Sequence, residues 1–160
     1  MLSFLTRCFE FDHWANAEAL KAIEVLAAPP EKAVKIFGHI LFAKEVWLVR
    51  LKRGDTARFA DPWPPYALDE CGPKLEDLRG RWADHLSSLD EGQLGQRIAY
   101  QNTQGRKAEH TLLNIVTQVA FHGQYHRGQL ASLIASAGGK APGTDYISYA
   151  FKTGEGRPLP

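Results

Sequence analysis

Apolar residues recur at intervals of three and four along most of the chain, which is the spacing of a helix that buries one face. The first such stretch covers residues 4–26, and a second apolar row runs beside the first, interrupted by His13 and Asn16. A helix that is apolar over so wide an arc packs against more than one neighbour, as in a bundle. Pro29 and Pro30 end it, because proline cannot donate the helical hydrogen bond.

The same spacing predicts three further helices. One covers residues 31–53 and ends at a Gly-Asp pair. Apolar positions across residues 75–89 predict the next, with Pro73 as its first helical residue. The clearest stripe covers residues 112–134 and is followed by two glycines. Four amphipathic helices of this length predict an all-α fold, a four-helix bundle.

Two segments between the helices have patterns of their own. Residues 55–72 are rich in proline and contain three aromatic residues, so this long loop is expected to pack onto the bundle or to shape a substrate pocket. Residues 97–100 alternate weakly in polarity, and residues 102–105 have the composition of a turn. We therefore expect a short hairpin before the last long helix.

Composition narrows the class of protein. The chain has 160 residues, 44% hydrophobic and 23% charged, which is typical of one globular domain over residues 1–160. A formal net charge of +1 gives no electrostatic case for a nucleic-acid partner. No stretch reaches the roughly 18 apolar residues of a membrane span, and the N-terminus lacks a signal-peptide pattern. Two isolated cysteines, Cys8 and Cys71, suit the reducing cytoplasm.

Six histidines against two cysteines mean that any metal site is built from imidazole. His122 and His126 lie about 40° and ~6 Å apart on one helix, on its apolar stripe. Random placement of six histidines produces such a pair about one time in five, so the pair alone is weak evidence for a metal site. His39, beside the apolar stripe of the second helix, strengthens that evidence. Three inward imidazoles suit Zn²⁺ or Ni²⁺ and leave one coordination position open. Hydrogen-bonded core histidines remain the alternative.

Four polar residues are candidates for a pocket around the metal. His13 and Asn16 either line a pocket that faces it or form a polar edge of the first helix. Gln118 and Gln129 each lie about one helical turn from a histidine of the last long helix. Each either orients an imidazole through its second nitrogen or lies at the surface or a dimer contact.

The remaining candidates have simpler explanations. Arg127 and Tyr125 point away from the two histidines beside them, and we expect Arg127 in a structural ion pair. His85 is expected at the boundary of the core, and His110 in solvent or in a helix cap. Cys8 lies on the apolar stripe of the first helix, where a thiol is inert.

Several motifs resemble those of the DinB/YfiT-like family. The run H-G-Q-Y-H-R-G-Q at residues 122–129 is similar to the family signature H-x-x-x-H-R-G-Q on the last long helix. Residues 138–146 continue with glycine, proline and T-D-Y, as the family does. Residues 39–51 resemble its H-I…W-L-x-R-L element, and residues 12–16 contain its W-A-N element. Order and spacing together are far more specific than two histidines alone.

The resemblance implies an up-down-down-up four-helix bundle that is usually a homodimer. It also implies a divalent metal bound by His39, His122 and His126, the same three residues that periodicity selects. Characterised relatives include transferases and isomerases that use low-molecular-weight thiols, which implies a small-molecule substrate and a thiol co-substrate. Relatives often have an acid directly after a small residue in helix two, whereas this chain has Lys44-Glu45, so we do not assign that acid a role.

Two functional hypotheses follow from a three-histidine site. In the first, the chain is a metal-dependent enzyme, an S-transferase or isomerase with a thiol, or a hydrolase with water. In the second, it is a non-catalytic structural or stress-related protein whose fold the metal stabilises. A fourth protein ligand would favour the second. The sequence names no general base.

Overall fold

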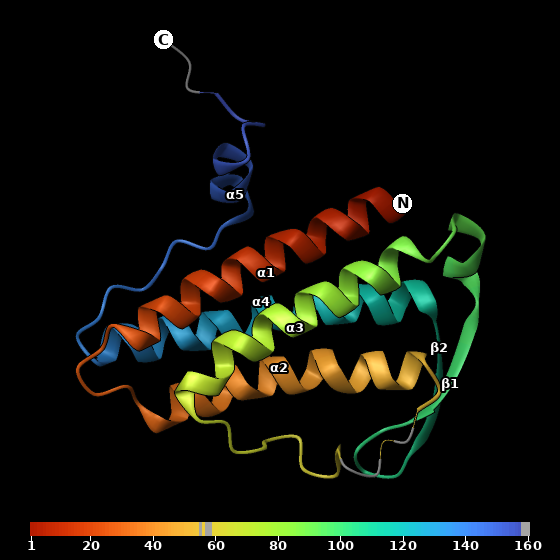
Figure 1. The fold of residues 1–160 in the computed structure, drawn as a ribbon, viewed down its shortest axis with the longest axis horizontal. Helices are drawn as coiled ribbons and strands as arrows, with labels where there is room; N and C mark the ends of the chain where they lie inside the picture. Colours follow the sequence, from red (N-terminus) through yellow and green to blue (C-terminus); the bar gives the residue numbers. More distant parts are fainter. Residues whose placement is uncertain (55, 57–58, 158–160) are drawn as a thin grey trace.

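The computed structural model describes residues 1–54, 56 and 59–157, and it is mostly helical with a small two-stranded sheet (Figure 1). In chain order the elements are α1 (Leu2–Glu24), α2 (Glu31–Leu51), α3 (Leu68–Ser87), the 3₁₀ helix η2 (Glu91–Gly95), β1 (Arg97–Gln101), β2 (Lys107–Thr111), α4 (Leu112–Ser136) and α5 (Tyr146–Lys152). The all-α prediction therefore holds for the main elements, and the small sheet is the predicted hairpin.

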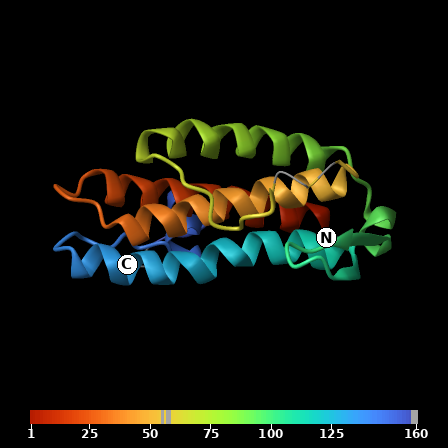
Figure 2. The same ribbon diagram turned by 90° about the horizontal axis from the view of Figure 1, so that it is seen from below.

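The four long helices of the described chain pack side by side. Both α1 and α2 contact α3 and α4. In Figure 1, α1 and α4 run in one direction, whereas α2 and α3 run in the opposite one. Figure 2 shows α3 and α4 on opposite sides of α1 and α2.

The core is formed by the apolar stripes that the sequence predicts. Ile23, Phe37, Leu78 and Leu130 come from the four long helices, and each is fully buried. Burial of a side chain of this size contributes roughly 1.5–3 kcal/mol to folding. Trp82 is also buried, and its indole Nε1 donates to a backbone carbonyl of α2 at 3.1 Å. These contacts fix the spacing between α2 and α3.

The start of α3 corrects one prediction. The helix begins at Leu68, so Pro73 lies inside it rather than at its first position. Glu70 Oε2 accepts a hydrogen bond from the backbone N–H of Ala67 at 2.8 Å, and Asp69 and Glu70 complement the positive end of the helix dipole. These local interactions begin the helix early, and Pro73 leaves only one carbonyl without its helical donor.

The predicted hairpin is confirmed, with Ile98 paired to His110 in an antiparallel register. Asn102 Oδ1 accepts from the backbone N–H of Gln104 at 2.9 Å, which closes the turn. Gly105 has φ +77°, a conformation that glycine adopts without a steric penalty. The hairpin leads directly into α4, so it fixes where that helix begins.

The short helix α5 is not among the helices that the sequence predicts. Tyr149 is buried, and its ring centroid lies 5.7 Å from that of Phe11 and 5.6 Å from that of Trp14, both in α1. Packing of these rings, rather than helix propensity, places the segment beside α1 (Figure 1).

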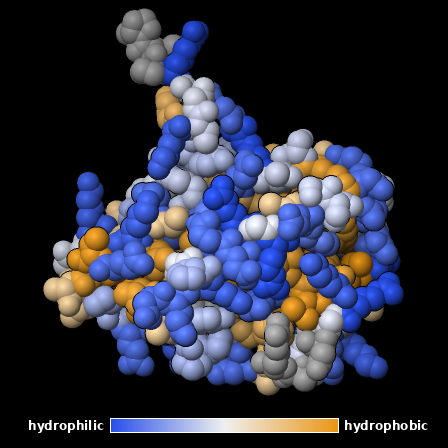
Figure 3. All heavy atoms as spheres, viewed as in Figure 1, coloured by the Kyte–Doolittle hydropathy of each residue, from blue (hydrophilic) through white to orange (hydrophobic). Residues whose placement is uncertain are grey.

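The surface carries no helix suited to a bilayer: among the described residues, no helix is both long and apolar enough to cross a membrane. In the view of Figure 3, hydrophilic residues cover most of the face, and hydrophobic residues form separate patches. Nine large apolar side chains are nevertheless exposed in the described chain, and some of them gather near α1, α4 and α5.

Candidate metal site

The structure brings the three predicted histidines together. His39 from α2 and His122 and His126 from α4 each offer a ring nitrogen, and these nitrogens lie within 4.8 Å of one another. The Nε2 atoms of His39 and His122 are 3.1 Å apart. Within the described part of the chain, no Asp, Glu or Cys joins this group. We call these residues the three-histidine cluster.

Hydrogen bonds on the far side of two rings set their tautomers. His39 Nδ1 lies 2.6 Å from the carbonyl oxygen of Pro62, which can only accept, so Nδ1 carries the hydrogen. His126 Nδ1 lies 3.1 Å from Oε1 of Gln129 and donates in the same way. Both Nε2 atoms then have a free lone pair, as metal-binding imidazoles require. Gln129 thus lies where one of its two predicted roles would place it.

The electrostatics favour the neutral ring at His39 and at His122. Burial lowers the pKa of His39 and lowers the pKa of His122 to about 4, and the neighbouring imidazoles add to both shifts. Neutral imidazole is the form that binds metal. Two nitrogens bound to one tetrahedral Zn²⁺ lie about 3.3 Å apart, so the 3.1 Å between His39 and His122 fits such an ion.

The loop between α2 and α3 forms one wall of the cluster. Trp63 stacks on His39, with ring centroids 4.1 Å apart and an interplanar angle of 20°. Phe59 is instead buried against Phe42 and Val46 of α2. The loop therefore both packs onto the helices and lines the site. Pro62 acts through its backbone carbonyl, for which the sequence contains no signal.

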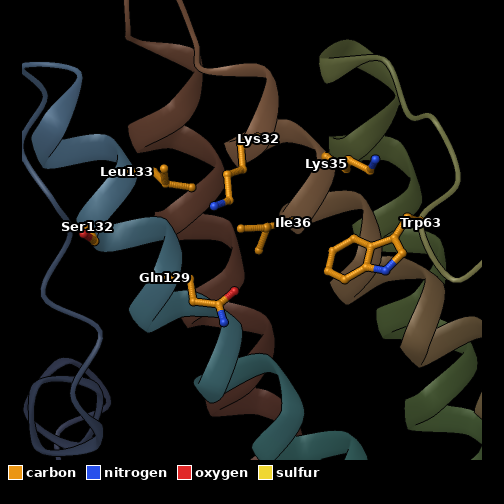
Figure 4. A pocket seen from close by; sticks show the side chains of 7 residues that line it. All are labelled: Lys32, Lys35, Ile36, Trp63, Gln129, Ser132 and Leu133. Carbon is orange, nitrogen blue, oxygen red and sulfur yellow. The ribbon is translucent and has the colours of Figure 1, made fainter.

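Cavities flank the cluster along the groove between α2 and α4. One of about 650 Å³ is lined by Lys32, Lys35, Ile36, Trp63, Gln129 and Leu133, among others (Figure 4). Another of about 480 Å³ is lined by Trp47, Tyr100, Gln118 and Phe121, among others. Gln118 is exposed here, about one turn from His122, and the hydrogen bond to an imidazole is made by Gln129 instead.

A buried ion network, which we define as Asp12, Asn16, Lys44 and Arg127, lies next to the cluster. Asp12 accepts from Lys44 Nζ at 2.6 Å and from Arg127 Nη1 at 2.5 Å. Arg127 also donates to Asn16 Oδ1 at 2.8 Å, and Asn16 donates to Asp12 at 3.0 Å. All four side chains are buried. The predicted ion pair of Arg127 is confirmed, and Asn16 belongs to this network.

The network corrects the interpretation of the first helix. The second apolar row of α1 is interrupted by Asp12 and Asn16, which are fully buried, rather than by His13. His13 Nε2 lies 3.1 Å from Oε1 of Glu76 and so faces α3. Asp12 was the missed residue. The sequence does contain a signal for it, because Asp12 falls in the apolar row of Leu5, Phe9, Leu20 and Ile23. Burial of an unpaired carboxylate there would cost too much free energy, so a partner is expected.

The other sequence candidates lie away from the cluster. His110 Nδ1 is 3.1 Å from the hydroxyl of Tyr100 in the hairpin, and His85 packs against Trp82. Cys8 and Cys71 are free and buried; burial raises the pKa of both thiols, that of Cys71 to about 11. Neither thiol is an effective nucleophile at neutral pH.

Fold and site together define a helical protein with a candidate three-histidine metal site between two of its helices. The family model of the DinB family matches residues 8–157, nearly the whole chain, so this protein belongs to the DinB family. It is similar to "Protein DinB" of Bacillus subtilis (strain 168), with 23% identity over 167 residues that cover 96% of this chain and 97% of that protein. The resemblance seen in the sequence motifs is thereby confirmed.

Proposed function

We propose that this protein binds a divalent metal ion, Zn²⁺ or Ni²⁺, through His39, His122 and His126, and that it is a metal-dependent enzyme acting on small molecules. The convergence of three imidazoles, with ring nitrogens within 4.8 Å of one another, is the observation that supports it. Such an ion supplies Lewis acidity, which lowers the pKa of a thiol or water molecule in its open coordination position. The reaction is then thiol S-transfer or isomerisation, or hydrolysis.

The chain's own residues have defined tasks in this proposal. The carbonyl of Pro62 and the amide of Gln129 hold two imidazoles in the tautomer that binds metal. Trp63 covers one face of His39 and limits access of water. Because Cys8 and Cys71 are buried, a nucleophilic thiol has to come from a low-molecular-weight co-substrate rather than from the protein.

One observation favours a second candidate function, a non-catalytic metal site that stabilises a structural or stress-related protein. The cluster joins α2 to α4, as a structural metal would. Structural zinc sites, however, are closed by four protein ligands, and within the described residues the cluster has three. We therefore place the enzyme first.

The proposed assembly is a homodimer of up-down-down-up four-helix bundles, each formed by residues 1–160 as one domain. The helix directions in Figure 1 support the topology. Phe4, Phe121 and Tyr146 are 54%, 59% and 37% exposed and line one apolar cavity of about 340 Å³, which a second copy would cover. We expect Phe121→Glu to be monomeric by light scattering, whereas Val25→Glu, at another exposed position, keeps the dimer.

The location and partners in this proposal follow from the same residues. Two reduced thiols support a cytoplasmic protein. A partly buried three-histidine cluster beside cavities supports a small-molecule substrate. The formal net charge of +1 supports no nucleic-acid partner, and we propose no membrane partner.

Turnover of a thiol with an electrophile tests the enzymatic function. Purified protein would be assayed with a panel of low-molecular-weight thiols, electrophiles and esters, before and after chelation and after zinc is added back. We expect consumption that chelation abolishes and zinc restores, absent in His122→Ala and retained in His110→Ala. If no substrate turns over and chelation only lowers the melting temperature, the structural function replaces the enzymatic one.

A further inference from the structure

The larger of the two flanking cavities shares its wall with the three-histidine cluster. Trp63, which lines the cavity, stacks on His39, and Gln129, which also lines it, bonds His126. At these two points the side chains of Trp63 and Gln129 separate the cavity from the imidazoles. We call it the lysine cavity, after Lys32 and Lys35 in its lining.

The described residues that line the lysine cavity carry positive charge only. Lys32 and Lys35 contribute two ammonium groups, and none of the described residues in the lining is Asp or Glu. Figure 4 shows the Lys32 side chain reaching toward Leu133 and Ile36. No ion pair of either lysine is present among the described residues, whereas Lys44 and Lys74 are both paired with carboxylates. Two ammonium groups with no carboxylate partner in the described part of the chain attract an anionic group to this cavity.

Spacing along α2 relates these charges to the cluster. Lys35 and Lys32 precede His39 by four and seven residues, which places them on the same side of the helix, about 6 and ~10 Å from it along the axis. Ile36 and Leu133 lie in the same lining and offer apolar surface. A ligand whose anionic group lies at the lysines would thus extend along this apolar surface toward the histidines.

We propose that the lysine cavity binds a carboxylate-bearing small molecule, with the carboxylate at Lys32 and Lys35 and the reacting end at the three-histidine cluster. The reacting end rests on the metal-dependent function proposed above, whereas the carboxylate subsite depends only on the two lysines. The substrate class is then an acid whose thiol or electrophilic atom lies roughly 6–10 Å from its carboxylate, the separation that the helix geometry sets.

Binding of hexanoate to the purified full-length chain tests the carboxylate subsite. The indole N–H signal of Trp63 in ¹H–¹⁵N NMR spectra reports occupancy, and its assignment comes from Trp63→Phe. We expect hexanoate to bind about fivefold more tightly than hexan-1-ol, because two partly exposed charge contacts each contribute modestly. Lys32→Ala/Lys35→Ala abolishes that preference, Lys32→Arg/Lys35→Arg retains it, and Lys140→Ala, an exposed lysine outside the cavity, leaves it unchanged.

Equal binding of hexanoate and hexan-1-ol by the wild-type protein, or unchanged hexanoate binding by the double alanine variant, would overturn the proposal. His126→Ala separates the two claims. If this variant has lost its metal and still prefers hexanoate, the subsite is independent of the metal, as proposed. If the wild-type protein takes up no metal, the proposed function fails. The preference for hexanoate over hexan-1-ol then still tests whether the carboxylate subsite exists.

A pair of thiols tests whether the reacting end of such a ligand lies at the three-histidine cluster. The protein would be loaded with Co²⁺ and titrated with 6-mercaptohexanoate or 6-mercaptohexan-1-ol, with thiolate-to-cobalt absorbance as the readout. We expect the acid to bind about fivefold more tightly, through the same two charge contacts, and the double alanine variant to bind both thiols alike. Equal affinity of the two thiols for the wild-type protein would contradict the proposed orientation.

Discussion

Arg127 donates from Nη1 to Oδ1 of Asp12 at 2.5 Å, and both side chains are almost completely buried. This pair ties α4 to α1 at the residue that directly follows His126. The position of the three-histidine cluster therefore depends on charged groups that do not belong to it.

Replacement of Asp12 by Asn tests how much this network stabilises the fold. The substitution keeps the size of the side chain but leaves the charges of Lys44 and Arg127 buried without a carboxylate. Loss of one partner of a buried ion pair typically costs about 3–5 kcal/mol, and we expect a loss of that order in the free energy of unfolding from urea titrations. Glu76→Gln, which removes the exposed partner of His13, is the control and should cost less than about 1 kcal/mol.

Gly123 offers a sharper test of the same contact. A Cβ atom at this position would lie 2.2 Å from Oδ1 of Asp12, so alanine would force the network apart. We expect Gly123→Ala to destabilise the protein by about 1–3 kcal/mol, as overpacking does. Gly128 lies in the same helix, where an added Cβ would meet no other part of the described chain within 4 Å, and Gly128→Ala should be neutral or stabilising by up to ~1 kcal/mol. Equal effects of the two substitutions on the melting temperature would contradict the close approach.

The lowered pKa values of His39 and His122 predict how stability of the metal-free protein depends on pH. The folded chain holds His122 with a pKa of about 4, whereas an unfolded histidine titrates near pH ~6.5. Between these values the unfolded state binds more protons, so stability falls as pH falls from ~6.5 toward 4. His39 shifts in the same direction. Chelated His122→Gln should lose less stability over this range than the chelated wild-type protein, in melting temperatures at a series of pH values. An identical loss would contradict the burial of His122 as a neutral ring.

The hydrogen bond from His126 to Gln129 predicts an effect on metal affinity. Loss of a partner that orients a metal-binding imidazole typically weakens affinity about 10–100-fold. We expect Gln129→Ala to lower zinc affinity by that factor in competition with a chromophoric chelator, with little change in the melting temperature of the metal-free protein. Gln118→Ala, at the other glutamine that the sequence singled out, should retain wild-type affinity, and a comparable loss there would overturn this division of roles.

Much of the fold and the site could be predicted because helical period links sequence to position. The spacing of His122 and His126, and of His39 against its apolar stripe, placed all three on faces that turn inward. The hairpin also followed from local chemistry, since a turn needs residues such as Asn102 and Gly105. These features depend on neighbours in the sequence, and a single chain is enough to find them.

Other features depend on contacts that sequence spacing does not encode. The carbonyl of Pro62 reaches His39 across a loop, and a backbone atom leaves no signature in residue type. The pairing of Asp12 with Lys44 and Arg127 joins three helices, so no one helical pattern contains it. Helix α5 forms because Tyr149 packs on α1, which overrides the weak helical tendency of so short a segment.

Metal content of the purified protein tests the central claim most directly. Inductively coupled plasma mass spectrometry would be applied to the wild-type protein and to His39→Ala, His122→Ala and His126→Ala, with His110→Ala as an exposed histidine control. We predict a stoichiometric divalent metal in the wild-type and His110→Ala proteins, and its loss from each of the three cluster variants. Equal metal content in all five proteins, or none in folded wild-type protein supplied with zinc and nickel, would contradict a three-histidine metal site.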